Sequence, residues 1–148
     1  MFRNGALEII RGPVTSCEAH SSAIELRVDR PTLAKRRWRA TAADGAEFGF
    51  DLREPLSDGS VFFHNGIHTY VVRQLPESLL CVRLTSPEQA ALVAWQIGNL
   101  HFSIMVREAE LLVEDDPAIR QMFQREEIIF GSTEAVFRPL GGGGHHHF

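Results

Sequence analysis

Apolar and polar residues alternate along the first half of the chain in a pattern that predicts short β-strands. The runs that carry this alternation are ALEIIRGPV, AIELRV, RRWRATA, AEFGFDL and SVFFHNGIHTYVVRQL. Dipeptides that favour tight hairpin turns separate or interrupt these runs, namely Asp44-Gly45, Asp58-Gly59 and Asn65-Gly66. The pattern therefore predicts a small N-terminal all-β domain over residues 1–74.

The pattern changes around QLPESLL, where a linker is predicted over residues 75–78. A strand, LLCVRL, follows, and Ser86-Pro87 then begins a helix as its N-cap and first helical residue. That helix carries Ala90, Val93, Ala94, Ile97 and Leu100 on one side. HFSIMVRE and AELLVED read as strands, AIRQMFQREE as a second helix and AVFRPL as a last strand. This β-α-β-β-α-β order predicts a ferredoxin-like domain over residues 79–140, and the chain as a whole is predicted to be α+β.

Composition and charge exclude several classes of protein. The 148 residues carry a formal net charge of −4, which argues against a nucleic-acid partner. The basic residues Lys35, Arg36, Arg37 and Arg39 are interpreted as a solvated strand face. No stretch approaches the roughly 20 apolar residues that span a bilayer, and no signal peptide is evident, so the cytoplasm is the expected location and no membrane partner is expected.

The chain ends in GGGGHHHF, residues 141–148. Four glycines cannot pack a core and leave the backbone free, whereas neutral imidazoles bind divalent nickel, copper and zinc. His145, His146 and His147 are therefore candidate metal ligands on a flexible tail. A purification tag is the competing interpretation of the same residues.

His101 is the candidate ligand within the folded part, because it follows the end of the apolar helix. A single imidazole does not hold a metal ion, and a buried or capping histidine is the simpler interpretation of this residue alone. A two-fold axis beside it would bring two copies of His101 to one point, where the helix dipole favours a cation.

The other histidines and cysteines give weaker signals. A two-residue turn at Asn65-Gly66 would pair His64 with Ile67 and point His64 and His68 to opposite faces of the hairpin. Cys17 and His20 resemble half of a zinc site without a second half, and His20, His64 and His68 could contact metal without a role. Cys17 and Cys81 form no CxxC motif and are interpreted as packing residues.

No catalytic motif is present: there is no nucleophile elbow, phosphate-binding glycine loop or HExxH sequence. The acidic residues Glu114, Asp115 and Asp116 precede Pro117, and helix capping together with the helix dipole explains them. The chain is therefore not expected to be an enzyme.

The segments RRWRATAADGAEFGFDL, LSDGSVF and AWQIGNLHF, followed by the glycine-to-histidine tail, together resemble the UreE family of urease accessory proteins. The most specific piece is Gly98-Asn99-x-His101. The resemblance covers roughly Lys35 to the end of the chain. It implies a nickel metallochaperone, with an N-terminal β-domain and a homodimer formed through a ferredoxin-like C-terminal domain.

The resemblance also implies the ligands and the partners. His101 and its copy from the other chain would bind Ni²⁺ together, and His145, His146 and His147 would supply further ligands. The nickel would be delivered to the urease apoprotein complex, with an accessory GTPase as the immediate partner. Asp115 and Pro117 flank Asp116 where some relatives have histidines, so secondary metal sites are not expected, and three tail histidines give little storage capacity.

Two alternatives from other classes stay open at this point. A peptide-binding or chaperone-like module would use exposed strands of the β-domain to pair with a partner segment, and chelators would not affect its binding. A zinc-stabilised dimer would never release its metal, and imidazole ligands alone do not separate Zn²⁺ from Ni²⁺.

Overall fold

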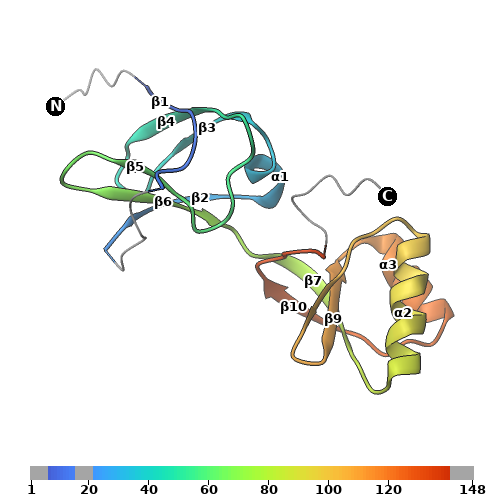
Figure 1. Ribbon diagram of the computed structural model, residues 1–148. Coiled ribbons are helices and arrows are strands. Elements are labelled where there is room, and N and C mark those ends of the chain that lie inside the picture. Colours follow the sequence, from blue (N-terminus) through green and yellow to red (C-terminus); the bar gives the residue numbers. More distant parts are fainter. Residues whose placement is uncertain (1–6, 16–21, 141–148) are drawn as a thin grey trace. The chain divides into compact units, whose positions relative to one another are not determined.

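The computed structural model describes residues 7–15 and 22–140. The chain divides into two compact units, Met1–Leu75 and Pro76–Phe148, and each is described by itself (Figure 1). Within the described residues the fold is mixed α+β, with three helices and ten strands. None of the helices in that part of the chain is long and apolar enough to cross a membrane.

The first unit consists of two three-stranded sheets. One has the order β1-β4-β3 and the other the order β2-β6-β5, and each combines one parallel with one antiparallel pairing. The strands are β1 (Glu8–Ile10), β2 (Ile24–Val28), β3 (Arg37–Thr41), β4 (Glu47–Asp51), β5 (Val61–His64) and β6 (Thr69–Gln74). All five alternating runs of the first half thus contain strands, as the pattern predicts.

Aromatic rings fill the core of the first unit. Trp38 and Phe50 stack with their ring centroids 3.8 Å apart. The Phe48 ring meets Phe62 and Tyr70 edge-on, each at 5.0 Å, and these five side chains are buried. Such edge-on and stacked pairs add to the free energy gained by burying the rings.

Two local features of the first unit differ from the sequence prediction. A short helix, α1 (Arg30–Leu33), follows β2, because the Asp29 carboxylate accepts the Thr32 N–H at 2.8 Å and Pro31 suits the first turn. The prediction of a two-residue turn at Asn65-Gly66 is also wrong. The Asn65 side-chain oxygen accepts the N–H groups of Ile67 and His68, which makes a four-residue loop, and His64 therefore pairs with Thr69.

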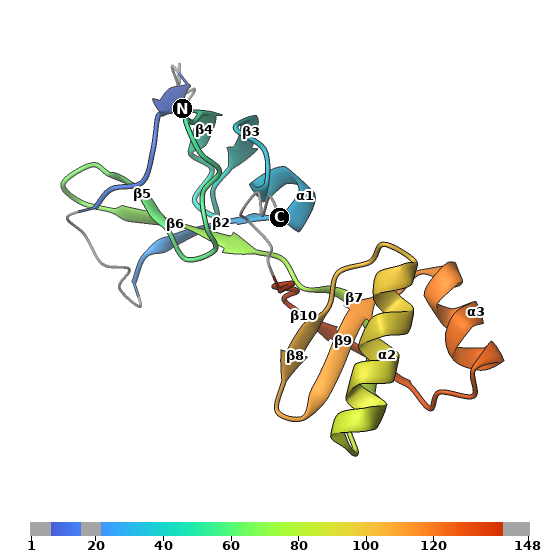
Figure 2. The same cartoon turned by 45° about the vertical axis from the view of Figure 1, so that its right-hand side comes forward.

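The second unit has the predicted β-α-β-β-α-β order, in which two helices cover one face of a four-stranded sheet (Figures 1 and 2). Its sheet order is β10-β7-β9-β8, with every neighbouring pair antiparallel. The elements are β7 (Glu77–Arg83), α2 (Pro87–Asn99), β8 (Met105–Arg107), β9 (Glu110–Glu114), α3 (Pro117–Arg125) and β10 (Gly131–Ala135). β7 begins inside the segment predicted as a linker.

Side-chain caps fix the starts of both long helices. The Ser86 hydroxyl accepts the Gln89 N–H at 3.1 Å, and the Gln89 side chain accepts the Thr85 N–H at 3.0 Å. The Asp116 carboxylate accepts the Ala118 N–H at 2.8 Å at the start of α3. The helices therefore begin where Ser86-Pro87 and Asp116-Pro117 predict.

The sequence pattern predicts AVFRPL as the last strand, and this prediction is wrong. β10 pairs with β7 from Gly131 to Ala135, and residues 136–140 leave the ladder. Phe137 has no exposed surface and packs with Leu79, Met105 and Leu112 on the face of the sheet opposite the helices. Burial of Phe137 gives the segment an apolar character that resembles a strand in sequence.

Candidate metal centre

His101 lies immediately beyond the end of α2, with its side chain exposed. Its backbone has φ of 64°, the left-handed conformation, and its N–H donates to the Gly98 carbonyl at 2.9 Å. The Leu100 N–H donates to the Ile97 carbonyl at 3.1 Å. These bonds satisfy carbonyls of the last helical turn and fix the position of His101.

The left-handed backbone of His101 is a feature that the sequence prediction lacks. Glycine usually occupies this position after a helix, because a Cβ there is unfavourable by about 1 kcal/mol or more. The sequence offers one signal, since the predicted helix end at Gly98-Asn99 or shortly beyond has no glycine in residues 99–103. Glu108, Ala109 and Glu127 also have positive φ values, so the conformation fixes where His101 stands but does not by itself indicate a role for the imidazole.

The face of α2 that points away from the core carries large apolar side chains. Trp95 is 62% exposed and Leu92 is 55% exposed, whereas Val93 and Ile97 on the opposite side are buried. Leu92, Trp95 and Asn99 share one side of the helix because they are three and four residues apart. We call Leu92 and Trp95 the α2 patch. It leads along the helix toward His101, and Leu100, which the sequence pattern places on one side with Val93 and Ile97, is 36% exposed, unlike those two buried residues.

The described chain ends close to the candidate ligand. The Leu140 N–H donates to the Ile104 carbonyl at 2.7 Å, and Ile104 follows His101 by three residues. Three residues span at most about 11 Å, and a hydrogen-bonded backbone pair adds about 5 Å, so the Cα atoms of Leu140 and His101 lie within about 16 Å. Residues 141–145 span up to about 17 Å when extended. His145 can therefore reach His101, although His145, His146 and His147 lie outside the described residues.

The carboxylates of Asp115 and Asp116 have structural partners. Asp115 forms a two-pronged ion pair with Arg120 at 2.6 and 2.9 Å, and the hydrogen bond from Arg120 lowers the pKa of Asp115. Asp116 caps α3, as the sequence predicts. Neither residue is therefore needed to explain the candidate metal centre.

The remaining histidines and cysteines do not form a second centre within the described residues. The Nδ1 atom of His64 lies 3.0 Å from the Thr69 hydroxyl, and the His68 ring lies edge-on to Tyr70 at 6.5 Å. Cys81 is a half-buried free thiol, and Cys17 and His20 lie outside the described residues. Across residues 7–15 and 22–140, no three His, Cys, Asp or Glu side chains come together as a metal site.

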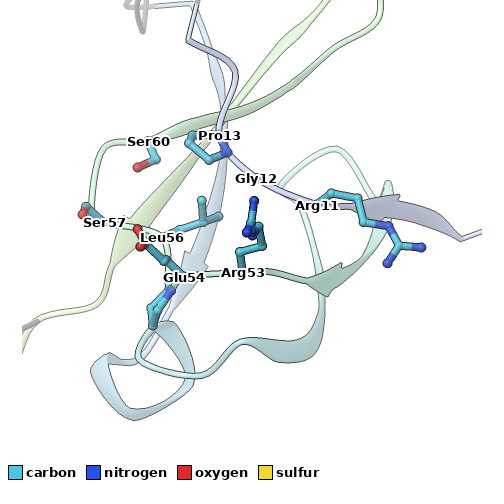
Figure 3. Close-up of a pocket in the computed structure, with 9 residues that line it drawn as sticks. Arg11, Gly12, Pro13, Arg53, Glu54, Leu56, Ser57 and Ser60 are labelled. Atoms are coloured by element: carbon cyan, nitrogen blue, oxygen red, sulfur yellow. The ribbon is translucent and has the colours of Figure 1, made fainter. Parts of the chain in front are cut away.

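The first unit contains a hollow of about 620 Å³ between the segment after β1 and the loop from β4 to β5 (Figure 3). Arg53 and Leu56 line it, together with Ser57 and Ser60. Arg11 stands at its edge and turns its guanidinium away, toward Asp51 at 2.6 Å. The lining contains no imidazole or thiol, so it lacks the ligands that nickel or zinc prefers.

Charge is distributed unevenly between the two units. The second unit has ten Asp and Glu against five Arg and no Lys, a formal net charge of −5 with histidine neutral. The whole chain carries −4, so the first unit carries +1. An acidic unit raises the local concentration of cations around it.

Comparison with known proteins shows the family of the chain. The model of the UreE urease accessory protein C-terminal domain matches residues 77–148. The urease accessory protein UreE of Geobacillus kaustophilus is 33% identical over 115 residues, which cover 74% of this chain and 78% of the relative. The UreE protein of Bacillus sp. (strain TB-90) is 28% identical over 144 residues, covering 91% and 96%, and that of Pseudomonas fluorescens (strain SBW25) is 30% identical over 131 residues, covering 84% and 79%. The chain therefore belongs to the UreE family of urease accessory proteins.

Proposed function

We propose that this protein is a nickel metallochaperone that binds Ni²⁺ between the two subunits of a homodimer and delivers it for assembly of the urease active site. It acts in the cytoplasm, is not itself an enzyme, and hands its cargo to an accessory GTPase and the urease apoprotein complex. Membership of the urease accessory family supports the pathway. The observation that carries the proposal is the placement of His101.

His101 suits a shared ligand because it is exposed and its backbone is fixed. Backbone hydrogen bonds from the N–H groups of Leu100, His101 and Phe102 hold the main chain at the end of α2, so little backbone entropy is lost when the imidazole binds an ion. One imidazole gives weak binding, but a two-fold axis beside His101 supplies a second from the partner. The negative end of the α2 dipole and the net charge of −5 on this unit favour the cation.

The α2 patch supports the homodimer. Two large apolar side chains on neighbouring turns of a helix are unfavourable when they are exposed to water, and a second copy of the same helix can cover both. Trp95 lies six residues before His101, about 9 Å along the helix axis at 1.5 Å per residue. A two-fold axis near the C-terminal end of α2 would therefore cover the patch and bring the two His101 residues together.

The tail histidines would complete the coordination and then release the ion. Imidazole binds nickel with intermediate strength, and a ligand on a glycine tether can dissociate one nitrogen at a time. A closed cage of thiolates would retain the ion too tightly for transfer. His145, His146 and His147 are therefore proposed as auxiliary ligands, with the His101 pair as the principal site.

Calorimetric titration of the metal-free protein with NiCl₂ tests this function. The best variant is His101→Gly, because glycine removes the imidazole and also suits the left-handed backbone. His101→Asn tolerates the same backbone and retains a polar side chain. Both should lose at least 100-fold in nickel affinity, whereas His64→Asn, which removes an exposed histidine of the first unit, should not change it.

Two further arms separate the alternatives. Deletion of residues 145–148 should weaken nickel binding without abolishing it. Nickel-loaded protein should activate urease apoprotein in the presence of the accessory GTPase, and the His101→Gly variant should not. Zinc that binds at His101 and resists exchange with nickel would favour the structural zinc dimer, and unchanged nickel affinity in His101→Gly would overturn the proposal.

A further inference from the structure

Residues 136–140 cross the face of the sheet opposite the helices, from one edge to the other. They follow β10, which is one outer strand of the order β10-β7-β9-β8, and they end at Ile104, next to the other outer strand, β8 (Figure 2). Neighbouring strands lie about 4.8 Å apart, so the three steps move the chain about 14 Å. We call residues 136–140 the strap.

Contacts of Phe137, Arg138 and Leu140 fasten the strap to the sheet. The Phe137 side chain is fully buried with Leu79 of β7, Leu112 of β9 and Met105 of β8. The Arg138 N–H donates to the Met105 Sδ atom at 3.3 Å. The Leu140 N–H donates to the Ile104 carbonyl at 2.7 Å, although the Leu140 side chain is 63% exposed.

The direction of the strap matters because of what lies at each edge. At the β10 edge, the chain would leave the sheet at Ala135, three strands away from β8. At the β8 edge, it leaves beside Ile104, three residues after His101. The strap therefore moves the start of the tail toward the candidate ligand and fixes it there.

We infer that the strap is a positioning device, in which Phe137 and the Leu140 N–H hold the tail close enough to His101 for its histidines to bind the same ion. This inference rests on the proposed nickel site. Phe137 and Leu140 contact no metal, and they act only through the place at which the tail begins. The contribution of the tail histidines to affinity is then set by an effective concentration that the strap controls.

The chain lengths give the size of the effect. Five residues lead from Leu140 to His145, and a flexible chain of that number of residues has a root-mean-square length of about 12 Å, which matches a separation of at most about 16 Å. Released at Ala135, the tether has ten residues, a length of about 17 Å, and a start at the far edge of the sheet. Doubling the number of residues lowers the effective concentration of the tail histidines at His101 about threefold, and the displaced start lowers it further. Release of the strap from the sheet should therefore reduce the tail's contribution to nickel affinity three- to tenfold.

The test measures nickel affinity by chelator competition in two matched pairs of variants. Phe137→Ala removes the buried anchor, and Phe137→Leu keeps an apolar one. Leu140→Pro removes the N–H that bonds to Ile104, and Leu140→Ala keeps it while removing an exposed side chain. Each variant is made with the native tail and with His145, His146 and His147 replaced by alanine, and circular dichroism confirms that each is folded.

With the native tail, Phe137→Ala should weaken nickel binding three- to tenfold and Leu140→Pro about two- to threefold, whereas Phe137→Leu and Leu140→Ala should stay near the wild type. With the alanine tail, none of the four should differ in nickel affinity from the protein that carries the alanine tail alone, because the strap then has no tail histidines to position. Any remaining difference would be a structural effect on His101. Should Phe137→Ala not fold, the Leu140 pair decides the test alone.

Two results overturn the inference. If the alanine tail weakens binding but Phe137→Ala and Leu140→Pro do not, the strap has no positioning role, while the nickel site stands. If Phe137→Ala weakens binding equally with both tails, Phe137 supports the fold and not the tail. Failure of the proposed function itself has a different signature, an unchanged nickel affinity in His101→Gly.

Discussion

Substitution of Trp95 by glutamate should separate the proposed dimer into single chains. Trp95 is 62% exposed, and an aromatic side chain buries about 200 Å² when covered, so burial in a dimer would remove about 120 Å² from water in each copy. Two copies give about 240 Å², which corresponds to an upper limit of about 6 kcal/mol at 25 cal/mol per Å². Even a third of this value is more than a tenfold change in the dimer dissociation constant.

The charge raises the cost beyond this loss of apolar area. Two glutamates would lie in the apolar interface, and each carboxylate would lose water without gaining a partner. We expect the dissociation constant to rise at least 100-fold in Trp95→Glu, and nickel affinity to fall at concentrations where the variant is a single chain. The reason for the second effect is that the two His101 ligands no longer share one ion.

Sedimentation equilibrium of the metal-free protein measures the dissociation constant directly. Ile129→Glu is the matched control, because Ile129 is also an exposed apolar residue of the second unit, 91% exposed, but lies outside α2. It should leave the dimer unchanged. A Trp95→Glu variant that dimerises as tightly as the wild type would refute the argument that the α2 patch is the subunit interface.

Two further substitutions test interactions that are structural in this account. Tyr70→Phe removes the hydroxyl that donates to Asp44 at 2.6 Å; burial opposes ionisation of Asp44, but hydrogen bonds from Tyr70 and the Ala46 N–H outweigh it and lower the pKa. A lowered pKa of Asp44 stabilises the fold above about pH 4, and this stabilisation is lost as the pH falls through the folded-state pKa. Urea unfolding of Tyr70→Phe should therefore show a free energy of unfolding about 1–2 kcal/mol lower than that of the wild type at pH 7, and a smaller difference at pH 3. An equal difference at both pH values would count against this argument. Asp116→Ala removes the cap of α3, which should cost about 1 kcal/mol in urea unfolding and leave nickel affinity unchanged. A fall in nickel affinity would instead make Asp116 a ligand.

The order of elements could be predicted because it depends on local signals. Ser86-Pro87 and Asp116-Pro117 are strong helix starts, and the two long helices begin at them. The end of the fold could not be predicted, because an apolar residue such as Phe137 fits both the predicted last strand and the observed strap. A strand residue and a residue anchoring a strap both need burial, and only the pairing of β10 with β7 distinguishes them. The two-residue turn predicted after His64 was wrong because the Asn65 side chain accepts the N–H groups of Ile67 and His68 and so stabilises a longer loop.

The candidate site was predictable only in part. The position of His101 after the helix follows from the sequence, and the structure places it there with an exposed side chain. The left-handed backbone depends on how the last turn closes onto Gly98, which no periodicity reveals. The position of Leu140 beside Ile104 depends on contacts between residues 36 apart in sequence, so the link between the tail and His101 emerges only in three dimensions.

The central claim is that one nickel ion lies between two His101 residues from two chains. The most direct test is to titrate the metal-free homodimer with NiCl₂ and count the ions bound in the tightest step. The account predicts one ion for each pair of chains, and the loss of this step in His101→Gly. One tightly bound ion for each chain, or a tightest step that persists in His101→Gly, would contradict it.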